Sequence, residues 1–269
     1  MASSYRRPLI VDFERARREH PSWPVVISEG DSWFSYSDVI GRLDDPQDTA
    51  LAKDQRPWCL LRLERAGDEV LSILSGGQRS KLRGYFERWP LDALLFSGGG
   101  NDIIGPDLLP LLRDFSPGAQ AQDLVQFSRF ERRLRQIQDC YRELLDLLLD
   151  AGQQAKVFVN SYDYVVPSDN GAELLGFVRV SGPWVKPHFE QRGIPQPMQA
   201  EVIQLLIDAF ATAIDQVASE PRGVGRLVRV ETRNLIQGDW KDEIHPDRKG
   251  AKRVAKAFET ALKEHGVLA

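Results

Sequence analysis

The chain has 269 residues, of which 42% are hydrophobic and 28% charged, proportions that exclude fibrous and disordered classes. Its 35 lysines and arginines are outnumbered by 39 acidic residues, so no overall positive field exists to attract nucleic acid. The two cysteines, Cys59 and Cys140, lack the CxxC or CxxH spacing of zinc sites. We therefore expect no nucleic-acid partner, no metal, no cofactor and a reducing, cytoplasmic location.

The apolar stretch near the N-terminus is too short for a signal peptide, because it covers residues 8–11 and ends at Asp12. No apolar run is long enough to cross a membrane, so we expect no membrane span. Neither a linker nor an internal repeat divides the chain. The sequence therefore predicts a single domain over residues 1–269.

Short apolar runs alternate with longer amphipathic patterns along the chain. In chain order we expect strands at residues 24–28 and 69–74, a helix at 78–89, a strand at 93–96, a helix at 127–151, a strand at 155–159, a helix at 196–219, a strand at 226–230 and a helix at 247–266. Most of the strands are apolar throughout, as in strands that are buried on both faces. This alternation predicts a parallel sheet between two layers of helices, which is an α/β fold.

Glycine and small polar residues follow the first three expected strands. They are Gly30-Asp31-Ser32, Ser75-Gly76-Gly77 and the segment 98–102, which reads GGGND. The last strand leads to Asp242-Glu243-Ile244-His245. Because ligands of parallel sheets bind at the carboxyl ends of the strands, we expect these segments to meet in one site.

These segments contain the groups that acyl transfer requires. We interpret Ser32 as the nucleophile and His245 as the base that takes its proton. Asp242, three residues before His245, can hold the other ring nitrogen and fix the tautomer. For the oxyanion we expect three donors, the backbone N–H groups of Gly76 and Ser32 and the side-chain amide of Asn101, with Gly77 as the alternative to Gly76.

The four segments together resemble the blocks of the SGNH hydrolases, also called GDSL-type esterases and lipases. Gly30-Asp31-Ser32, Gly76, Gly99-Gly100-Asn101-Asp102 and Asp242-Glu243-Ile244-His245 occur in the order of that family. The resemblance implies a flavodoxin-like three-layer α/β/α fold with a mainly five-stranded parallel sheet. It also implies metal-free ester hydrolysis through an acyl-enzyme, with the roles given above for Ser32, His245 and Asp242.

Substrate contacts are expected from residues beside these blocks. Trp33 follows the nucleophile, and Tyr162 and Asp163 follow the fourth strand. Residues 161–197 form a long connection that is either a lid or a surface excursion packed on its own aromatic residues. The leucine-rich stretch 104–115 is either a wall of an acyl pocket or part of the core.

Three other functions remain as alternatives to a serine esterase acting on a small-molecule ester. An α/β-hydrolase is disfavoured because the segment around Ser32 lacks the second glycine of a nucleophile elbow. A metallophosphoesterase needs several His and carboxylate ligands, and the chain has only four histidines. A catalytically silent binding or sensing module would be expected to have lost a catalytic residue, and each of them is present.

Overall fold

A five-stranded parallel sheet forms the centre of the computed structural model, which describes residues 10–37, 39–40, 58–105, 107–174 and 178–269. Its strand order is β2-β1-β3-β4-β7, and each neighbouring pair is parallel. The strands are β1 (Val25–Gly30), β2 (Cys59–Arg62), β3 (Ala93–Ser97), β4 (Lys156–Asn160) and β7 (Leu227–Val230). A separate antiparallel pair consists of β5 (Ala172–Leu174) and β6 (Val178–Ser181).

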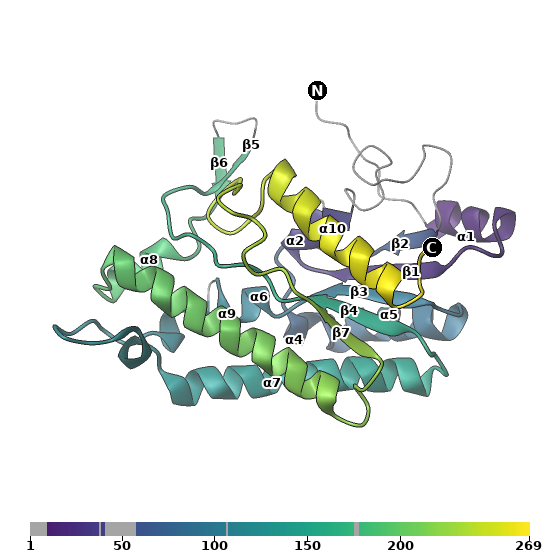
Figure 1. Ribbon diagram of the computed structural model, residues 1–269, viewed down its shortest axis with the longest axis horizontal. Helices are drawn as coiled ribbons and strands as arrows, with labels where there is room; N and C mark the ends of the chain where they lie inside the picture. The colour runs from purple at the N-terminus through teal and green to yellow at the C-terminus, as the bar shows by residue number, and fades with distance from the viewer. Residues whose placement is uncertain (1–9, 38, 41–57, 106, 175–177) are drawn as a thin grey trace.

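Helices cover both faces of this sheet. In Figure 1, α10 lies above the sheet, whereas α7 and α9 lie below it. The longer helices are α1 (Ile10–Glu19), α5 (Gly76–Arg88), α7 (Phe127–Asp150), α9 (Gln196–Ser219) and α10 (Arg248–Glu264). Short helices are α2 (Ser32–Ser35), α4 (Val70–Ile73), α6 (Gly100–Ile103), α8 (Lys186–Gln191) and the 3₁₀ turns Leu109–Leu111 and Ala121–Leu124. The predicted three-layer α/β/α fold is confirmed.

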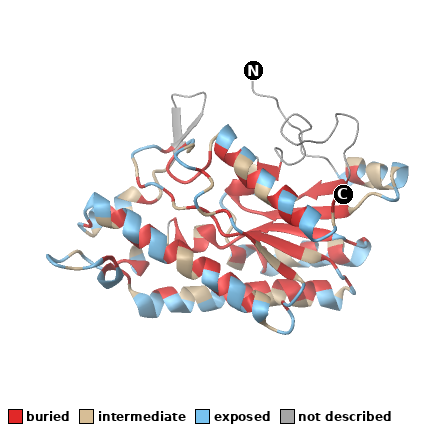
Figure 2. Ribbon diagram, viewed as in Figure 1, coloured by how far each residue is buried: buried red, intermediate tan, exposed pale blue. Residues whose placement is uncertain are grey.

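The burial of each element follows from its sequence pattern. All residues of β1 and β3 are buried, and the central strands are uniformly red in Figure 2. In α7, apolar side chains such as Phe130, Tyr141 and Leu144 are buried at helical spacing, whereas Arg132 and Arg135 on the opposite side are exposed. The sheet is therefore the core, and each helix buries one face against it or against a neighbouring helix.

The second strand is not where the sequence predicted it. Residues 69–74, expected as a strand, contain the helix α4, and the second strand of the sheet is β2 at Cys59–Arg62. Short apolar runs do not distinguish strand from helix by periodicity. Here a side chain distant in sequence favours the helix. Asp102 accepts a hydrogen bond from the N–H of Val70, which is the first residue of α4.

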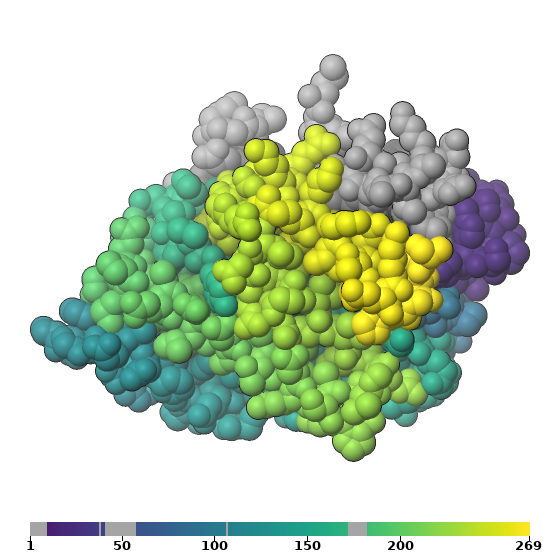
Figure 3. All heavy atoms as spheres, viewed as in Figure 1, coloured from purple at the N-terminus to yellow at the C-terminus, as the bar shows by residue number. Residues whose placement is uncertain are grey.

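The remaining predicted elements are confirmed with small shifts at their ends. Helix α9 matches its predicted bounds, and β3 extends one residue beyond them. By length and composition α9 could cross a membrane, but half of its apolar window is buried inside the protein, as in a core helix. Figure 3 shows α9, in green, lying on the same face of the molecule as the C-terminal segment, in yellow.

Candidate active site

The turn after β1 brings Ser32 to the carboxyl end of the sheet. Gly30 ends β1 with φ +143, and a Cβ atom there would lie 2.2 Å from the backbone oxygen of Ser97 on β3. Only glycine permits this approach of the two strands. Asp31 then caps α2, accepting a hydrogen bond from the N–H of Trp33 at 3.0 Å, and Ser32 is the first residue of the helix.

The Asp31 carboxylate is the centre of a buried polar cluster beneath Ser32. It accepts hydrogen bonds from the Ser97 hydroxyl at 2.8 Å and from the Tyr162 hydroxyl at 2.5 Å. Burial raises the pKa of Asp31 to about 6, and the hydrogen bonds from Tyr162, Ser97 and Trp33 oppose that rise. This cluster joins the ends of β1 and β3 to Tyr162, which lies in the segment after β4. It therefore fixes the turn that carries Ser32.

His245 and Asp242 form the pair that the sequence predicted. The Nδ1 atom of His245 lies 2.8 Å and 2.9 Å from the two carboxylate oxygens of Asp242. The same carboxylate accepts the backbone N–H groups of Ile244 and His245, at 3.1 Å and 2.9 Å. Within the described part of the chain, Nε2 of His245 is buried and has no hydrogen-bond partner. The ring is therefore oriented by Asp242, and its second nitrogen is free to act as a base.

Helix α2 lies against the turn that carries His245. The indole N–H of Trp33 donates to the backbone oxygen of Ile244 at 3.0 Å, and the ring of Tyr36 packs edge-on against the His245 ring, 4.7 Å between centroids. Both contacts come from residues within four positions of Ser32. No hydrogen bond joins the Ser32 hydroxyl to His245 in this structure, and such bonds are often long before substrate binds.

Asn101 lies in α6, shortly after β3, and one hydrogen of its side-chain amide has no acceptor among the described residues. One N–H of the side chain donates to the backbone oxygen of Asp68 at 2.9 Å. Because an amide nitrogen carries two hydrogens, the second can serve an oxyanion. Asp102 beside it holds α4 through Val70, which agrees with a structural role for this carboxylate.

The predicted donor Gly76 does not follow a strand in this structure. It is an exposed residue at the start of α5, beyond α4. The glycine that follows β2 is Gly67, which has φ +83. The chain runs beside β1 up to Arg65, whose N–H donates to the backbone oxygen of Gly30 at 2.8 Å. Along the chain, Gly67 therefore lies between Arg65, which pairs with the end of β1, and Asp68, whose carbonyl binds Asn101.

The three predicted substrate contacts have different positions. Trp33 and Tyr162 line a small cavity beside Ser32. Asp163 does not line it, because its two carboxylate oxygens accept the backbone N–H groups of Asn234 and Ile236, at 2.7 Å and 2.8 Å. The prediction that Asp163 contacts substrate is therefore not supported, and its carboxylate holds the connection between β7 and α10.

Glu243, between the two catalytic candidates in sequence, anchors the long connection 161–197. Its carboxylate accepts the backbone N–H groups of Ser168 at 3.2 Å, Val185 at 2.8 Å and Lys186 at 2.7 Å, and also that of Trp184. The sequence predicted no role for Glu243, although its position within the Asp-x-x-His block was an available signal. Its contacts link this segment directly to the turn that carries His245. That the segment acts as a lid stays a prediction.

The aromatic ring of Trp184 completes the surroundings of His245. It packs edge-on against the imidazole with 5.3 Å between ring centroids. Together with Tyr36, it encloses the ring of the candidate base in aromatic side chains. The backbone of Trp184 is one of the groups held by Glu243, so the position of this wall depends on that carboxylate.

The sequence did not predict the buried charged residues near the site. Arg62 pairs with Glu64 at 2.6 Å and donates to the backbone oxygen of Phe34 in α2 at 3.3 Å. The Ser28 hydroxyl donates to the other oxygen of Glu64. Burial is the main cause that raises the pKa of Glu29 in β1 to about 7, and the nearby charges of Asp68 and Glu64 add to it.

Glu29→Gln is expected to stabilise the protein increasingly as the pH rises from 4.5 to about 7, and to keep that gain at higher pH. The pKa of Glu29 rises from 4.5 to about 7 on folding, so the folded state holds this proton more tightly. The stability of the wild-type protein from this group is therefore present below pH 4.5 and is lost as the pH rises through about 7. We expect the variant to gain about 3 kcal/mol over wild type between these limits. Urea unfolding across this range measures it, and a pH-independent difference would contradict it.

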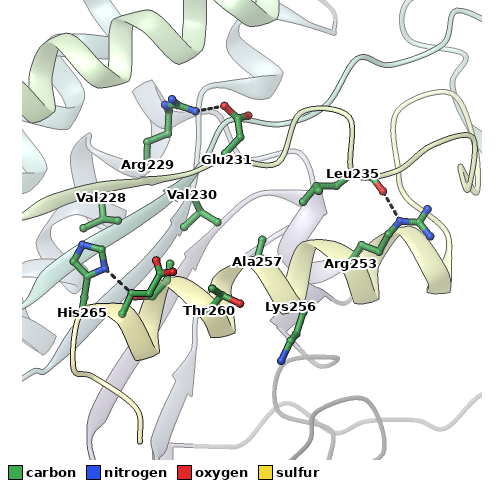
Figure 4. Close-up of a pocket in the computed structure, with 12 residues that line it drawn as sticks. Val228, Arg229, Val230, Glu231, Leu235, Arg253, Lys256, Ala257, Thr260 and His265 are labelled. Atoms are coloured by element: carbon green, nitrogen blue, oxygen red, sulfur yellow. Dashed lines mark hydrogen bonds and ion pairs between the residues drawn. The ribbon is translucent and has the colours of Figure 1, made fainter.

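Cavities of different character lie near the sheet, and two of them can be compared with the predicted site. The larger, about 520 Å³, lies between β7 and α10, where Val228, Ala257 and His265 are among its walls, and none of the predicted site residues lines it (Figure 4). The smaller is lined by Ser32, Asn101 and apolar side chains. Across the described residues, no group of three or more His, Cys, Asp or Glu side chains is arranged to hold a metal ion. The predicted chemistry is therefore associated with the smaller cavity.

Solved structures of the same fold include two lipases. The lipase Lip_vut3 from a goat rumen metagenome superimposes with a TM-score of 0.54 and 14% identity, over 88% of this chain and 97% of that one. An extracellular lipase from Streptomyces rimosus gives a TM-score of 0.52 and 14% identity, over 88% of this chain and 99% of that one. No protein-family model and no curated protein matches the sequence. At this level of identity the likeness establishes the fold, which is the one that the sequence blocks implied.

Proposed function

We propose that this protein hydrolyses carboxylic esters through an acyl-enzyme formed on Ser32. The observation that carries the proposal is the His245 ring, whose Nδ1 is held by Asp242 while its buried Nε2 is unpaired beside the helix of Ser32. An imidazole oriented in this way is suited to deprotonate a hydroxyl. The two lipases that share the fold support an ester as the substrate.

The reaction follows from these positions. His245 Nε2 takes the proton of the Ser32 hydroxyl as the oxygen attacks the ester carbonyl. The bond to the alkoxy oxygen then breaks, and the proton on Nε2 passes to the departing alcohol. Water attacks the acyl-enzyme in the second half and gives a proton to Nε2. That proton then passes to the Ser32 oxygen as its bond to the acyl carbon breaks, and the acid leaves. Asp242 keeps its charge throughout and stabilises the imidazolium that forms in each half.

We propose that the oxyanion is held by Asn101 and by the backbone N–H groups of Ser32 and Gly67. Asn101 uses one amide hydrogen for the Asp68 carbonyl and keeps the second for the substrate. Gly67 takes the place that the sequence analysis gave to Gly76, because Gly67 is the glycine that follows β2. Removing one such donor typically costs about 10²- to 10³-fold in kcat.

Gly67→Ala and Gly76→Ala separate the two assignments. Both glycines have positive φ, +83 and +50, and a Cβ atom at either meets no other atom within 4 Å. The backbone strain should therefore be similar, roughly 1–3 kcal/mol for each. We expect kcat/KM to fall roughly 10²-fold in Gly67→Ala, because a shifted donor no longer meets the oxyanion. Gly76→Ala should retain wild-type kcat/KM, and the reverse result would restore Gly76 as the donor.

Hydrolysis of p-nitrophenyl acetate by the purified protein, with and without EDTA, tests the proposed reaction. We expect turnover that EDTA does not change. Loss of turnover with EDTA would favour metal-dependent hydrolysis instead. A folded protein that neither hydrolyses esters nor reacts with a fluorophosphonate would favour the silent binding module.

A further inference from the structure

The cavity beside Ser32 is mostly apolar. Its walls come from several elements and are Asp31, Ser32, Trp33, Gly100, Asn101, Ile104, Tyr162, Val165, Ile207 and Ile244. Ile104 comes from the stretch 104–115, and Ile207 belongs to α9. The apolar members are almost completely buried, with Ile207 at 1% and Ile104 at 4% exposure. A group that enters this cavity therefore leaves water and contacts mainly hydrocarbon.

The cavity is small. The space open to the centres of water molecules is about 20 Å³. One water molecule needs about 10–15 Å³ measured in this way. The cavity therefore takes one or two groups of that size, such as the methyl group of an acetyl ester. Its walls are themselves packed against the core, so a longer chain would have to displace buried side chains.

The position of His245 decides which half of an ester this cavity receives. His245 delivers a proton to the departing alkoxy oxygen, so the alcohol must lie on the side of that ring. His245 does not line the cavity, whereas Ser32 and Asn101 do. An ester with its carbonyl carbon at Ser32 and its oxygen toward Asn101 therefore places its acyl chain in the cavity.

We propose that the substrates are esters of acetic acid or of similarly short acids, selected by this cavity. The inference rests on the proposed ester hydrolysis and adds to it the size of the acyl group. It places no limit on the alcohol, which lies outside the cavity. One surplus methylene in an apolar pocket changes kcat/KM by roughly 10- to 200-fold.

The p-nitrophenyl esters of acetate, butyrate and octanoate test this inference, because they share one leaving group and differ only in the acyl chain. We expect kcat/KM for acetate to exceed that for butyrate by roughly 100-fold or more. Hydrolysis of butyrate or octanoate as fast as acetate would overturn the inference and leave the proposed function intact. No hydrolysis of any of the three, with no fluorophosphonate adduct, would overturn both.

Two variants that enlarge the cavity test whether the cavity selects the length of the acyl chain. Ile207→Ala, and independently Val165→Ala from another wall, should raise the ratio of butyrate to acetate kcat/KM roughly 10-fold or more. Ile214→Ala removes an equally buried isoleucine from the same helix, away from the cavity, and should leave the ratio unchanged. The ratio does not depend on the fraction of folded protein. An unchanged ratio in both cavity variants would overturn the inference.

Discussion

Ser32→Ala is expected to reduce kcat for ester hydrolysis by on the order of 10⁵- to 10⁶-fold, because no other group in the site can form the acyl-enzyme. The hydroxyl is the only atom removed. The hydrogen bonds that hold the turn are accepted by Asp31 from Trp33, Ser97 and Tyr162, and they remain in place. The free energy of unfolding should therefore change little. Initial rates with p-nitrophenyl acetate, together with urea unfolding, measure both quantities.

Ser35→Ala is the matched control for that variant. Ser35 lies on the same four-residue helix, and its hydroxyl donates to the backbone oxygen of Asp31 at 3.1 Å. The change removes the same atom without touching the predicted nucleophile. We expect activity close to that of wild type. If Ser35→Ala lost activity as fully as Ser32→Ala, the loss would have to be assigned to the helix and not to the nucleophile.

Asp242→Asn is expected to reduce kcat by roughly 10⁴-fold while the fold is retained. One oxygen of Asp242 accepts the backbone N–H groups of Ile244 and His245, and an asparagine oxygen can keep both bonds. The amide nitrogen then faces Nδ1 of His245 and donates to it. The ring proton moves to Nε2, so His245 can no longer accept the proton of the nucleophile. Steady-state rates and a thermal unfolding curve test these two expectations together.

Asp247→Asn provides the comparison for Asp242→Asn. Asp247 caps α10 by accepting the N–H groups of Lys249 at 2.7 Å and Gly250 at 2.9 Å. The same substitution five positions further along keeps a capping oxygen, removes the negative charge at the N-terminus of α10 and should leave kcat unchanged. Equal losses of kcat in the two variants would show that the carboxylate acts through the stability of this region and not through the His245 tautomer.

Much of the fold was predictable because its signals are local. The period of buried residues in α7 and α9 marks both helices, and continuous apolar runs mark β1, β3 and β4. The second strand was not predictable in this way. Residues 69–74 are rich in β-branched and apolar residues, yet α4 forms there with a cap supplied by Asp102, thirty-two positions away from Val70.

The candidate site was predictable where it depends on short motifs. The Asp242–His245 pair follows from a three-residue spacing, and the structure places it as expected. The oxyanion glycine was predicted from the position of the second strand. Because β2 lies earlier in the chain than predicted, the proposed donor is now Gly67 in place of Gly76. The anchoring of the long connection by Glu243 depends on backbone N–H groups brought together only in three dimensions. No sequence pattern identifies those partners.

The cavity beside Ser32 could not be predicted from the sequence either. Its walls Trp33, Ile104 and Ile207 come from three separate elements, and the stretch 104–115 could be placed only as wall or core. Both interpretations apply, to different residues of the stretch. Ile104 lines the cavity, whereas Leu108 and Leu111 are buried core residues. Cavity size depends on how these side chains meet, and spacing along one element does not encode it.

The intact mass of the protein after incubation with a fluorophosphonate probe is the most direct test of Ser32 as the nucleophile. We expect one adduct per chain, located on Ser32 by peptide mapping, absent in Ser32→Ala and unaffected by EDTA. We also expect Asp242→Asn to slow the labelling, because His245 must take the proton of the nucleophile. A folded protein that forms no adduct, or an adduct that persists in Ser32→Ala, would contradict the assignment of Ser32 as the nucleophile.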